Sequence, residues 1–126
     1  MVVWRTGETH PRFPYARALS RAAPRGTLGL MSRPTKLDHG IDTWLAQHDG
    51  WTRDGTKAIA RAYSFADFSS ALGFVVRLGC LAEKKDHHPE IDLGWGRVRV
   101  LWTTHDAGGL TRLDLEMAEA SDALKG

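Results

Sequence analysis

One short segment joins the first two predicted strands of this chain, and this feature constrains the fold more than any other. Residues 51–53 and 57–63 have strand-like patterns, and Asp54-Gly55 between them is a dipeptide that favours a tight type I′ turn. So short a connection joins antiparallel neighbours, because a parallel connection needs a crossover. The sheet is therefore predicted to be antiparallel.

A further strand is predicted over residues 97–104, where side chains of two kinds alternate. One face carries Val98, Val100 and Trp102, and the other carries Arg97, Arg99 and Leu101. The first face is expected to be half of a buried core. Gly108-Gly109 ends the pattern.

Two longer helices are predicted from capping boxes, in which Ser or Thr is followed three residues later by an acidic residue. The first box is Ser64 to Asp67, and its helix is predicted to run to about Lys85, because Pro89 prevents continuation. Its predicted buried stripe consists of Phe68, Leu72, Val75, Gly79 and Ala82. Cys80 lies in this helix and is expected to be a small, buried apolar side chain.

The second box, Thr111 to Asp114, opens a last helix whose predicted apolar face consists of Leu113, Met117, Ala120 and Leu124. A short helix is also predicted between a cap at Asp38 and Gly50. The order is then helix, two strands, helix, one or two strands, helix. We expect a two-layer α+β sandwich in which an antiparallel four-stranded sheet carries three helices on one face. Its other face is left open or forms a contact between subunits.

Arginine is concentrated at one end of the chain, which indicates a boundary near residue 35. Residues 1–35 hold six arginines and one glutamate, a net charge of +5, and four of the five prolines. Residues 36–126 hold 11 basic and 14 acidic residues, a net charge of −3. We interpret 1–35 as a basic tail: a transit peptide, a nucleic-acid-binding arm, a solvated arm, or an extension upstream of an initiator at Met31. Residues 36–126 are the predicted domain.

Several classes of protein are disfavoured by composition. The 126 residues suffice for one domain. No apolar run approaches the roughly 20 residues of a membrane helix and no secretory signal is evident, so we expect a soluble, cytoplasmic protein without membrane contact. A single cysteine excludes an internal disulfide and a cysteine-based zinc site. The acidic domain argues against direct nucleic-acid binding, because phosphate contacts need clustered basic residues.

Three histidines within 19 positions, His87, His88 and His105, are the main functional signal. They lie at the predicted ends of a helix and a strand, where rigid elements support functional side chains. Acidic residues accompany them at Glu83, Asp86, Glu90, Asp106 and Asp114. The sequence predicts that these segments converge.

The residues alone leave three interpretations of this cluster. Zinc binding is disfavoured, because adjacent histidines rarely reach one ion and helical ligand spacings are absent. The histidines could be exposed or structural side chains, with Asp114 acting only as a helix cap. They could also carry acid-base catalysis, since imidazole gives and takes protons near neutral pH. The sequence has no nucleophile elbow, phosphate loop or dinucleotide fingerprint.

The segments around these histidines resemble the signature of the pterin-4a-carbinolamine dehydratases. The similar residues are 82–90 (AEKKDHHPE), Trp95, 103–111 (TTHDAGGLT) and Asp114, and the likeness extends over about residues 37–122. The resemblance implies the α+β fold expected above and assembly as a homo-dimer or homo-tetramer. It implies dehydration of 4a-hydroxytetrahydropterin, the product of aromatic amino acid hydroxylases, to quinonoid dihydropterin. It implies no metal and no other cofactor.

The resemblance also implies roles for individual residues. His87 and His105 would transfer protons, His88 would bind or orient the pterin ring, and Asp114 would orient a histidine. Further residues implied at the substrate site are Glu83, Asp86, Pro89, Thr104, Asp106, Trp51 and Trp95, with the two tryptophans as pocket walls or as core residues. Residues 91–96 (IDLGWG) depart from the family pattern.

The same resemblance carries a second hypothesis. Animal members of the family also act as dimerisation cofactors of a homeodomain transcription factor. A non-enzymatic protein-binding module is therefore the alternative function. Such a module would tolerate the loss of His87 and His105, whereas an enzyme would not.

Overall fold

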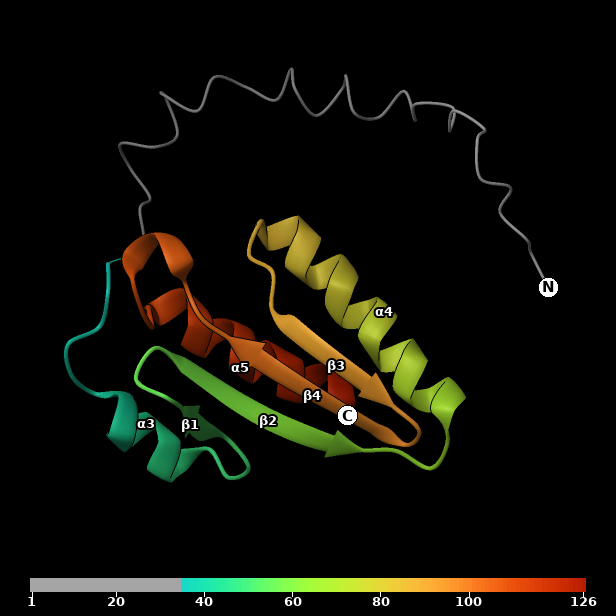
Figure 1. Ribbon diagram of the computed structural model, residues 1–126. Helices are drawn as coiled ribbons and strands as arrows, with labels where there is room; N and C mark the ends of the chain where they lie inside the picture. Colours follow the sequence, from blue (N-terminus) through green and yellow to red (C-terminus); the bar gives the residue numbers. More distant parts are fainter. Residues whose placement is uncertain (1–34) are drawn as a thin grey trace, which may run out of the picture. The chain divides into compact units, whose positions relative to one another are not determined.

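The computed structural model describes residues 35–126, which form a four-stranded sheet with three α-helices (Figure 1). The strands are β1 (Thr52–Asp54), β2 (Ala58–Ser64), β3 (Glu90–Gly94) and β4 (Arg97–Trp102). The helices are α3 (Ile41–Gln47), α4 (Phe68–Lys85) and α5 (Arg112–Lys125), with a short 3-10 helix η1 (His105–Ala107). The predicted α+β fold is confirmed. The tail predicted over 1–35 lies outside the described residues except for its last residue, and stays a prediction.

The sheet has the strand order β1-β2-β4-β3, and every neighbouring pair is antiparallel. One face is the core face, where Val98, Val100 and Trp102 of β4 are fully buried as predicted. Ile59 of β2 pairs with Trp102 on this face, and residues from all three helices pack against it. The opposite face carries the small cluster of Ala58, Ala60 and Leu101, and no helix of residues 35–126 lies over it. The sheet therefore has one covered and one open face.

The hairpin between β1 and β2 is antiparallel as predicted, but its turn is longer than a type I′ turn. Asp54 pairs with Ala58, so three residues join the strands, and Gly55 adopts φ +62°. The carbonyl oxygen of Lys57 accepts a hydrogen bond from the Thr103 hydroxyl at 2.5 Å. This bond attaches the Lys57 backbone to the residue that follows β4, and β2 begins only at Ala58.

Helix α4 begins at Phe68, because Asp67 is its N-cap and not Ser64. The Asp67 carboxylate accepts a hydrogen bond from the Ser70 backbone N–H at 2.7 Å. This bond lowers the pKa of Asp67 below its ordinary value of 3.8. The capping box predicted at Ser64 is wrong, since that residue still pairs with Arg97 as the last residue of β2.

The predicted buried stripe of α4 is correct at Ala82, half-buried at Val75 and Gly79, and wrong at Phe68 and Leu72. The buried residues are Ala71, Phe74, Leu78 and Ala82, while Phe68 and Leu72 are 46% and 43% exposed. Both stripes have helical spacing, so periodicity does not choose between them. The observed rotation places the ring of Phe74 4.9 Å from that of Tyr63 and 5.3 Å from that of Phe65. It also leaves Cys80 exposed, contrary to expectation.

Helix α5 begins at the predicted capping box, with both hydrogen bonds between Thr111 and Asp114 present. Its buried residues are Asp114, Met117, Ala118 and Ser121, so the predicted apolar face is correct only at Met117. Leu113 and Leu124 are half-buried at the edge of the core. The small side chains face β4, where the Ser121 hydroxyl accepts a hydrogen bond from Trp102 Nε1 at 3.1 Å.

Helix α3 runs from Ile41 to Gln47 and is bounded neither by Asp38 nor by Gly50. Its N-cap is Gly40, whose φ of 89° lies in the left-handed region that glycine adopts readily. Trp44 of α3 donates a hydrogen bond to Glu119 of α5 at 2.9 Å. No helix within residues 35–126 has the length and apolar character needed to cross a membrane.

A hydrogen-bond network around Asp122 ties β2 to α5. Its carboxylate accepts hydrogen bonds from Tyr63 Oη at 2.5 Å, from Arg61 at 3.0 Å and from Trp51 Nε1 at 3.0 Å. Burial and the contact with Asp122 raise the pKa of Tyr63 far above its ordinary value of 10.0. The network holds the helical layer on the sheet.

Candidate active site

The C-terminal end of α4 turns the chain so that His87 returns toward the sheet. Asp86 is the C-cap in a left-handed conformation, with φ 49°, and its N–H bonds back to the last turn of the helix. The His87 N–H donates to the Ala82 carbonyl at 3.1 Å. The His87 ring then stacks on Trp102 of β4, with ring centroids 5.3 Å apart. The helix cap and the core together fix this histidine.

Asp114 holds His87 by one ring nitrogen. The distance from His87 Nε2 to Asp114 Oδ1 is 2.5 Å, and the carboxylate is fully buried. Its other oxygen, Oδ2, accepts hydrogen bonds from the Thr104 hydroxyl at 2.6 Å and the Thr111 N–H at 2.9 Å. An ionised carboxylate only accepts hydrogen bonds, so with Asp114 in that form Nε2 of His87 is the donor and carries a proton. In neutral His87 the other nitrogen, Nδ1, is then free to accept a proton.

His88 lies beside His87 but in a more exposed position. Its Nε2 lies 2.7 Å from Glu83 Oε2, and more than half of both side chains is exposed. The contact spans the end of α4 and keeps the His88 ring at the rim. The adjacent residues His87 and His88 thus present one imidazole that is only 11% exposed and one that is 56% exposed.

His105 enters from the second segment, just past β4. It is the first residue of η1, whose tight turn is closed by the bond from the Gly108 N–H to the His105 carbonyl at 3.0 Å. Gly108 adopts φ 73°, which this turn requires. Thr104 precedes the turn and is anchored on Asp114. One buried carboxylate therefore fixes His87 directly and the backbone before His105 through Thr104.

The three histidines line one hollow of about 250 Å³. Its lining residues are Asp86, His87, His88, Thr103, Thr104, His105 and Asp106. Two chain segments separated by β3 and β4 therefore meet here, as the sequence analysis predicted. Within residues 35–126, no group of three or more His, Cys, Asp or Glu side chains is arranged to hold a metal ion.

The sequence profile of one protein family, described as pterin 4 alpha carbinolamine dehydratase, matches residues 36–124. The chain belongs to this family. A relative from Bradyrhizobium sp. strain BTAi1, provisionally named a pterin-4-alpha-carbinolamine dehydratase, is 49% identical over 81 residues, or 64% of this chain and 82% of its own length. A relative from Rhizorhabdus wittichii with the same provisional name is 55% identical over 71 residues, or 56% of this chain and 73% of its own length.

Solved structures show the same fold. A Brucella melitensis protein described as a transcriptional coactivator/pterin dehydratase superposes with a TM-score of 0.67 at 40% identity, covering 73% of this chain and 99% of its own. A pterin dehydratase-like RuBisCO assembly factor of the alpha-carboxysome superposes with a TM-score of 0.53 at 23% identity, covering 63% of this chain and 96% of its own. The second likeness concerns the fold alone.

The dehydratase family signature and the hollow overlap only in part. Asp114 lies behind the hollow, and Glu83 and Pro89 do not line it. Trp51 is 4% exposed and sits in the core, bonded to Asp122, which was one of its two predicted roles. Trp95 is 77% exposed between β3 and β4. Neither tryptophan forms a wall of the hollow.

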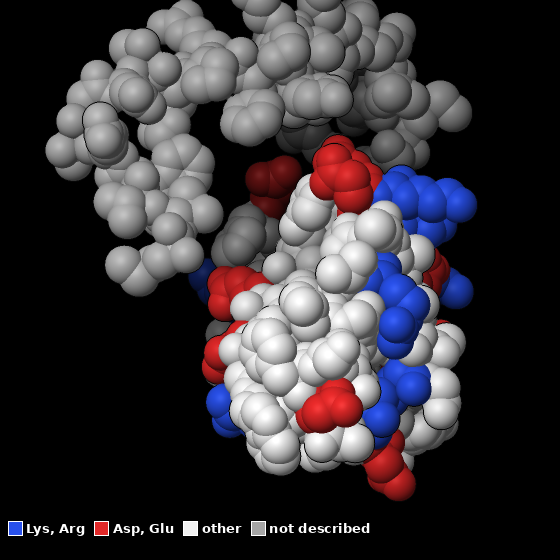
Figure 2. All heavy atoms as spheres, turned by 90° about the vertical axis from the view of Figure 1, so that its right-hand side faces the viewer, with Lys and Arg blue, Asp and Glu red and all other residues white. Residues whose placement is uncertain are grey.

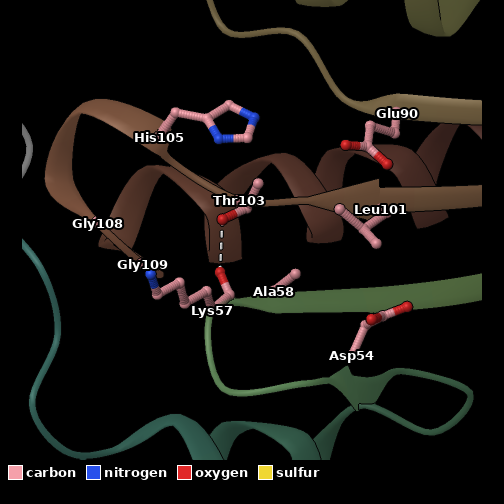
Figure 3. Close-up of a pocket in the computed structure, with 9 residues that line it drawn as sticks. All are labelled: Asp54, Lys57, Ala58, Glu90, Leu101, Thr103, His105, Gly108 and Gly109. Carbon is pink, nitrogen blue, oxygen red and sulfur yellow. Dashed lines mark hydrogen bonds between the residues drawn. The ribbon is translucent and has the colours of Figure 1, made fainter.

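Sequence analysis did not identify Thr103 as a site residue, although it lines this hollow. It also lines a second hollow, of about 330 Å³, on the open face of the sheet (Figure 3). A sequence signal for Thr103 was present, because the alternation of side chains along β4 places Leu101 and Thr103 on the same, open face. Only the pairing of β4 with β2 shows that Lys57 and Ala58 lie next to them.

Proposed function

We propose that the chain catalyses the dehydration of 4a-hydroxytetrahydropterin to quinonoid dihydropterin. The observation that carries the proposal is the pairing of His87 with the buried Asp114, in a hollow that His105 also lines. Membership of the dehydratase family supports the substrate class. We expect the protein to act in the cytoplasm, and we expect an aromatic amino acid hydroxylase to supply the substrate.

His87 is the proposed base. Nε2 of His87 donates to Asp114, so Nδ1 accepts the proton from N5 of the pterin. The electron pair of the N–H bond forms the C4a=N5 double bond. The buried carboxylate stabilises the imidazolium that results, as an ionised partner does for a histidine base.

His105 is the proposed acid. It protonates the 4a hydroxyl as the C4a–O bond breaks, and water leaves. Its exposed position lets it recover a proton from solvent. His87 gains one proton and His105 loses one, so the reaction leaves no net change once both exchange with water. Each transfer contributes about 10² to 10⁴ in rate.

His88 and its neighbours are proposed to hold the pterin ring. His88, paired with Glu83, faces the same hollow as His87 and His105. Asp86, Thr104 and Asp106 contribute to the wall, and Pro89 directs the chain from His88 into β3. We propose that this reaction needs neither a metal ion nor another cofactor, because proton transfer by imidazoles supplies the chemistry.

The test is the dehydration of freshly generated 4a-hydroxytetrahydropterin, followed by ultraviolet absorbance in the presence of a chelator. We expect acceleration by the wild type and a loss of about 10²-fold or more in His87→Ala and in His105→Ala. His39→Ala is the matched control, because His39 is exposed and lies outside the hollow. A folded wild type that gives no acceleration would contradict the proposal, as would equal activity in all variants.

Self-assembly is proposed through the exposed face of α4. Phe68, Leu72 and Val76 follow one another at intervals of four residues and are 43–56% exposed. Figure 2 shows a largely uncharged area on this side of the molecule, with basic side chains along one border and acidic side chains at the other borders and within its lower part. An apolar stripe of this kind is typical of a helix that packs on a second copy or another protein. We expect Leu72→Glu to reduce the mass measured by light scattering, and Ala123→Glu on α5 to leave it unchanged.

A protein-binding role is the second candidate function, and the same stripe favours it. The similar Brucella melitensis protein is described as a transcriptional coactivator as well as a pterin dehydratase. A role of this kind would depend on Leu72 and not on His87 or His105. Binding of a transcription factor that survives His87→Ala but is lost in Leu72→Glu would support it, and the reverse result would exclude it.

A further inference from the structure

The position of His105 depends on the main chain that carries it. Hydrogen bonds and ion pairs hold the rings of His48, His87 and His88, but within residues 35–126 none holds the ring of His105. His105 is nevertheless the proposed acid, and a general acid acts only when its proton lies within hydrogen-bond reach of the leaving oxygen. The contacts that fix the backbone before His105 therefore bear directly on catalysis.

The connection between β4 and β2 continues one residue beyond the paired strands. Trp102, paired with Ile59, is the last residue of β4 in the ladder. The next residue, Thr103, donates a hydrogen bond from its hydroxyl to the main-chain carbonyl of Lys57 at 2.5 Å, drawn as the dashed line in Figure 3. A carbonyl oxygen only accepts, so the Thr103 proton is committed to this bond. Thr103 thus ties the end of β4 to the residue that precedes β2.

A second threonine fastens the same strand end on the opposite face. Successive side chains of a strand point to opposite faces, so Thr103 lies on the open face and the buried Thr104 on the core face. The Thr104 hydroxyl donates to the buried Asp114 at 2.6 Å. A chain held at one point can rotate about that contact, whereas two contacts on opposite faces prevent this rotation. His105, the next residue, then leaves the sheet in one direction.

The acceptor of the Thr103 bond is itself held in place. Lys57 belongs to the turn between β1 and β2, and its neighbour Ala58 pairs with Asp54 across that turn. Asp54 also forms an ion pair with Arg99 of β4. The Lys57 carbonyl is therefore a fixed point to which Thr103 can be anchored.

We propose that Thr103 is a positioning residue for the dehydration: its bond to Lys57 fixes the strand end so that His105 presents its proton to the 4a hydroxyl. Thr103 acts through His105 and not by donating to the pterin, because the Lys57 carbonyl already takes its proton. The inference rests on the proposed dehydratase function, and it adds to that site a residue on the open face of the sheet.

The test compares Thr103→Val, which removes the hydroxyl at nearly constant volume, with Thr103→Ser, which keeps it. We expect Thr103→Val to lower kcat by about 10- to 100-fold, because a small displacement of a catalytic group has effects of this size. KM should stay within about twofold, since an interaction that acts only in the transition state lowers kcat and kcat/KM equally. Thr103→Ser should stay within about threefold of the wild type, since it keeps the donor. Thr52→Val is the matched control, because Thr52 lies on the same face in β1 and lines neither hollow.

A double-mutant cycle tests whether Thr103 acts through His105. In the His105→Ala background, Thr103→Val should change kcat by less than about twofold, because the group that it positions is already absent. In the His87→Ala background, Thr103→Val should still lower kcat by about tenfold or more. A general loss of structure would lower kcat in both backgrounds alike.

Amide exchange provides a measurement that needs no turnover. The N–H groups of Ala107 and Gly108 are bonded within the turn that His105 begins. Thr103→Val should raise their exchange rates by about five- to tenfold, as the loss of one hydrogen bond implies, and Thr52→Val should not.

The outcomes separate the two claims. With an active wild type, the inference is overturned if Thr103→Val keeps its kcat, raises KM alone, or costs as much in the His105→Ala background as in the wild type, and the dehydratase function stands. Unchanged amide exchange at Ala107 and Gly108 would also overturn it. If the folded wild type does not dehydrate the pterin, the proposed function fails and this inference fails with it.

Discussion

Replacing Asp114 by asparagine tests the pairing on which the mechanism depends. In the wild type, the buried carboxylate accepts hydrogen bonds from His87 Nε2, the Thr104 hydroxyl and the Thr111 N–H. Asparagine has one oxygen, which can continue to cap α5 by accepting from Thr111. Its amide nitrogen then faces His87 Nε2 and donates. His87 must therefore move its own proton to Nδ1, the nitrogen that the mechanism needs as the base.

The size of the effect follows from these contacts. The wrong tautomer and the loss of the charge that stabilises the imidazolium together should lower kcat by about 10² to 10⁴. A hydrogen bond to a charged group contributes about 1.5–3 kcal/mol, so the free energy of unfolding should fall by about 2 kcal/mol. KM should change little, because Asp114 lies behind the hollow and does not line it.

The assay is steady-state dehydration together with urea unfolding. Asp67→Asn is the matched control, since Asp67 also caps a helix but accepts its hydrogen bond from Ser70 and does not contact His87. It should keep its kcat. An Asp114→Asn variant that keeps kcat within about threefold of the wild type would refute the assignment of Asp114 as the residue that orients His87.

Three further predictions concern the fold. Leu78→Ala should lower the free energy of unfolding in urea by about 2–5 kcal/mol, because Leu78 is fully buried and leaves a cavity; a loss below about 1 kcal/mol would contradict the core described here. Tyr63→Phe should cost about 1–2 kcal/mol in the same assay, because Asp122 loses one donor, and no cost would show that the network is not stabilising. The pKa of Asp67 is lowered in the folded state, so its stabilising effect is complete above its ordinary pKa of 3.8 and is lost as pH falls through the folded value. The protection of amides at the start of α4, after correction for the pH dependence of intrinsic exchange, should fall over that range in the wild type and not in Asp67→Asn.

Sequence patterns predicted the elements that rest on local chemistry. The Thr111 capping box and the alternation of Val98, Val100 and Trp102 were predicted correctly, because neighbours in sequence determine both. The rotation of α4 was not, because its apolar residues fit two stripes and only packing of Phe74 against Tyr63 and Phe65 distinguishes them. The predicted start of α4 was wrong for a related reason. Local signals place the N-cap at Ser64, but pairing with β4 keeps Ser64 in β2.

The candidate site likewise has features that follow from local sequence and others that depend on long-range packing. The clustering of His87, His88 and His105 follows from their positions at element ends. The contact between His87 and Asp114 spans 27 residues, and spacing alone does not predict it. The second hollow depends on the alignment of Lys57 with Thr103 across two strands, which appears only in the assembled sheet. Long-range pairing is therefore the part of this site that the sequence does not encode locally.

The pH dependence of kcat/KM, measured for the wild type, His87→Ala and His105→Ala, tests the central claim most directly. A base that must be neutral and an acid that must be protonated give the wild type a bell-shaped profile. His87→Ala should lose the fall at low pH, and His105→Ala should lose the fall at high pH, each with a rate reduced by at least about 10². Wild-type activity with both limbs retained in either variant would contradict acid-base dehydration by this pair of histidines.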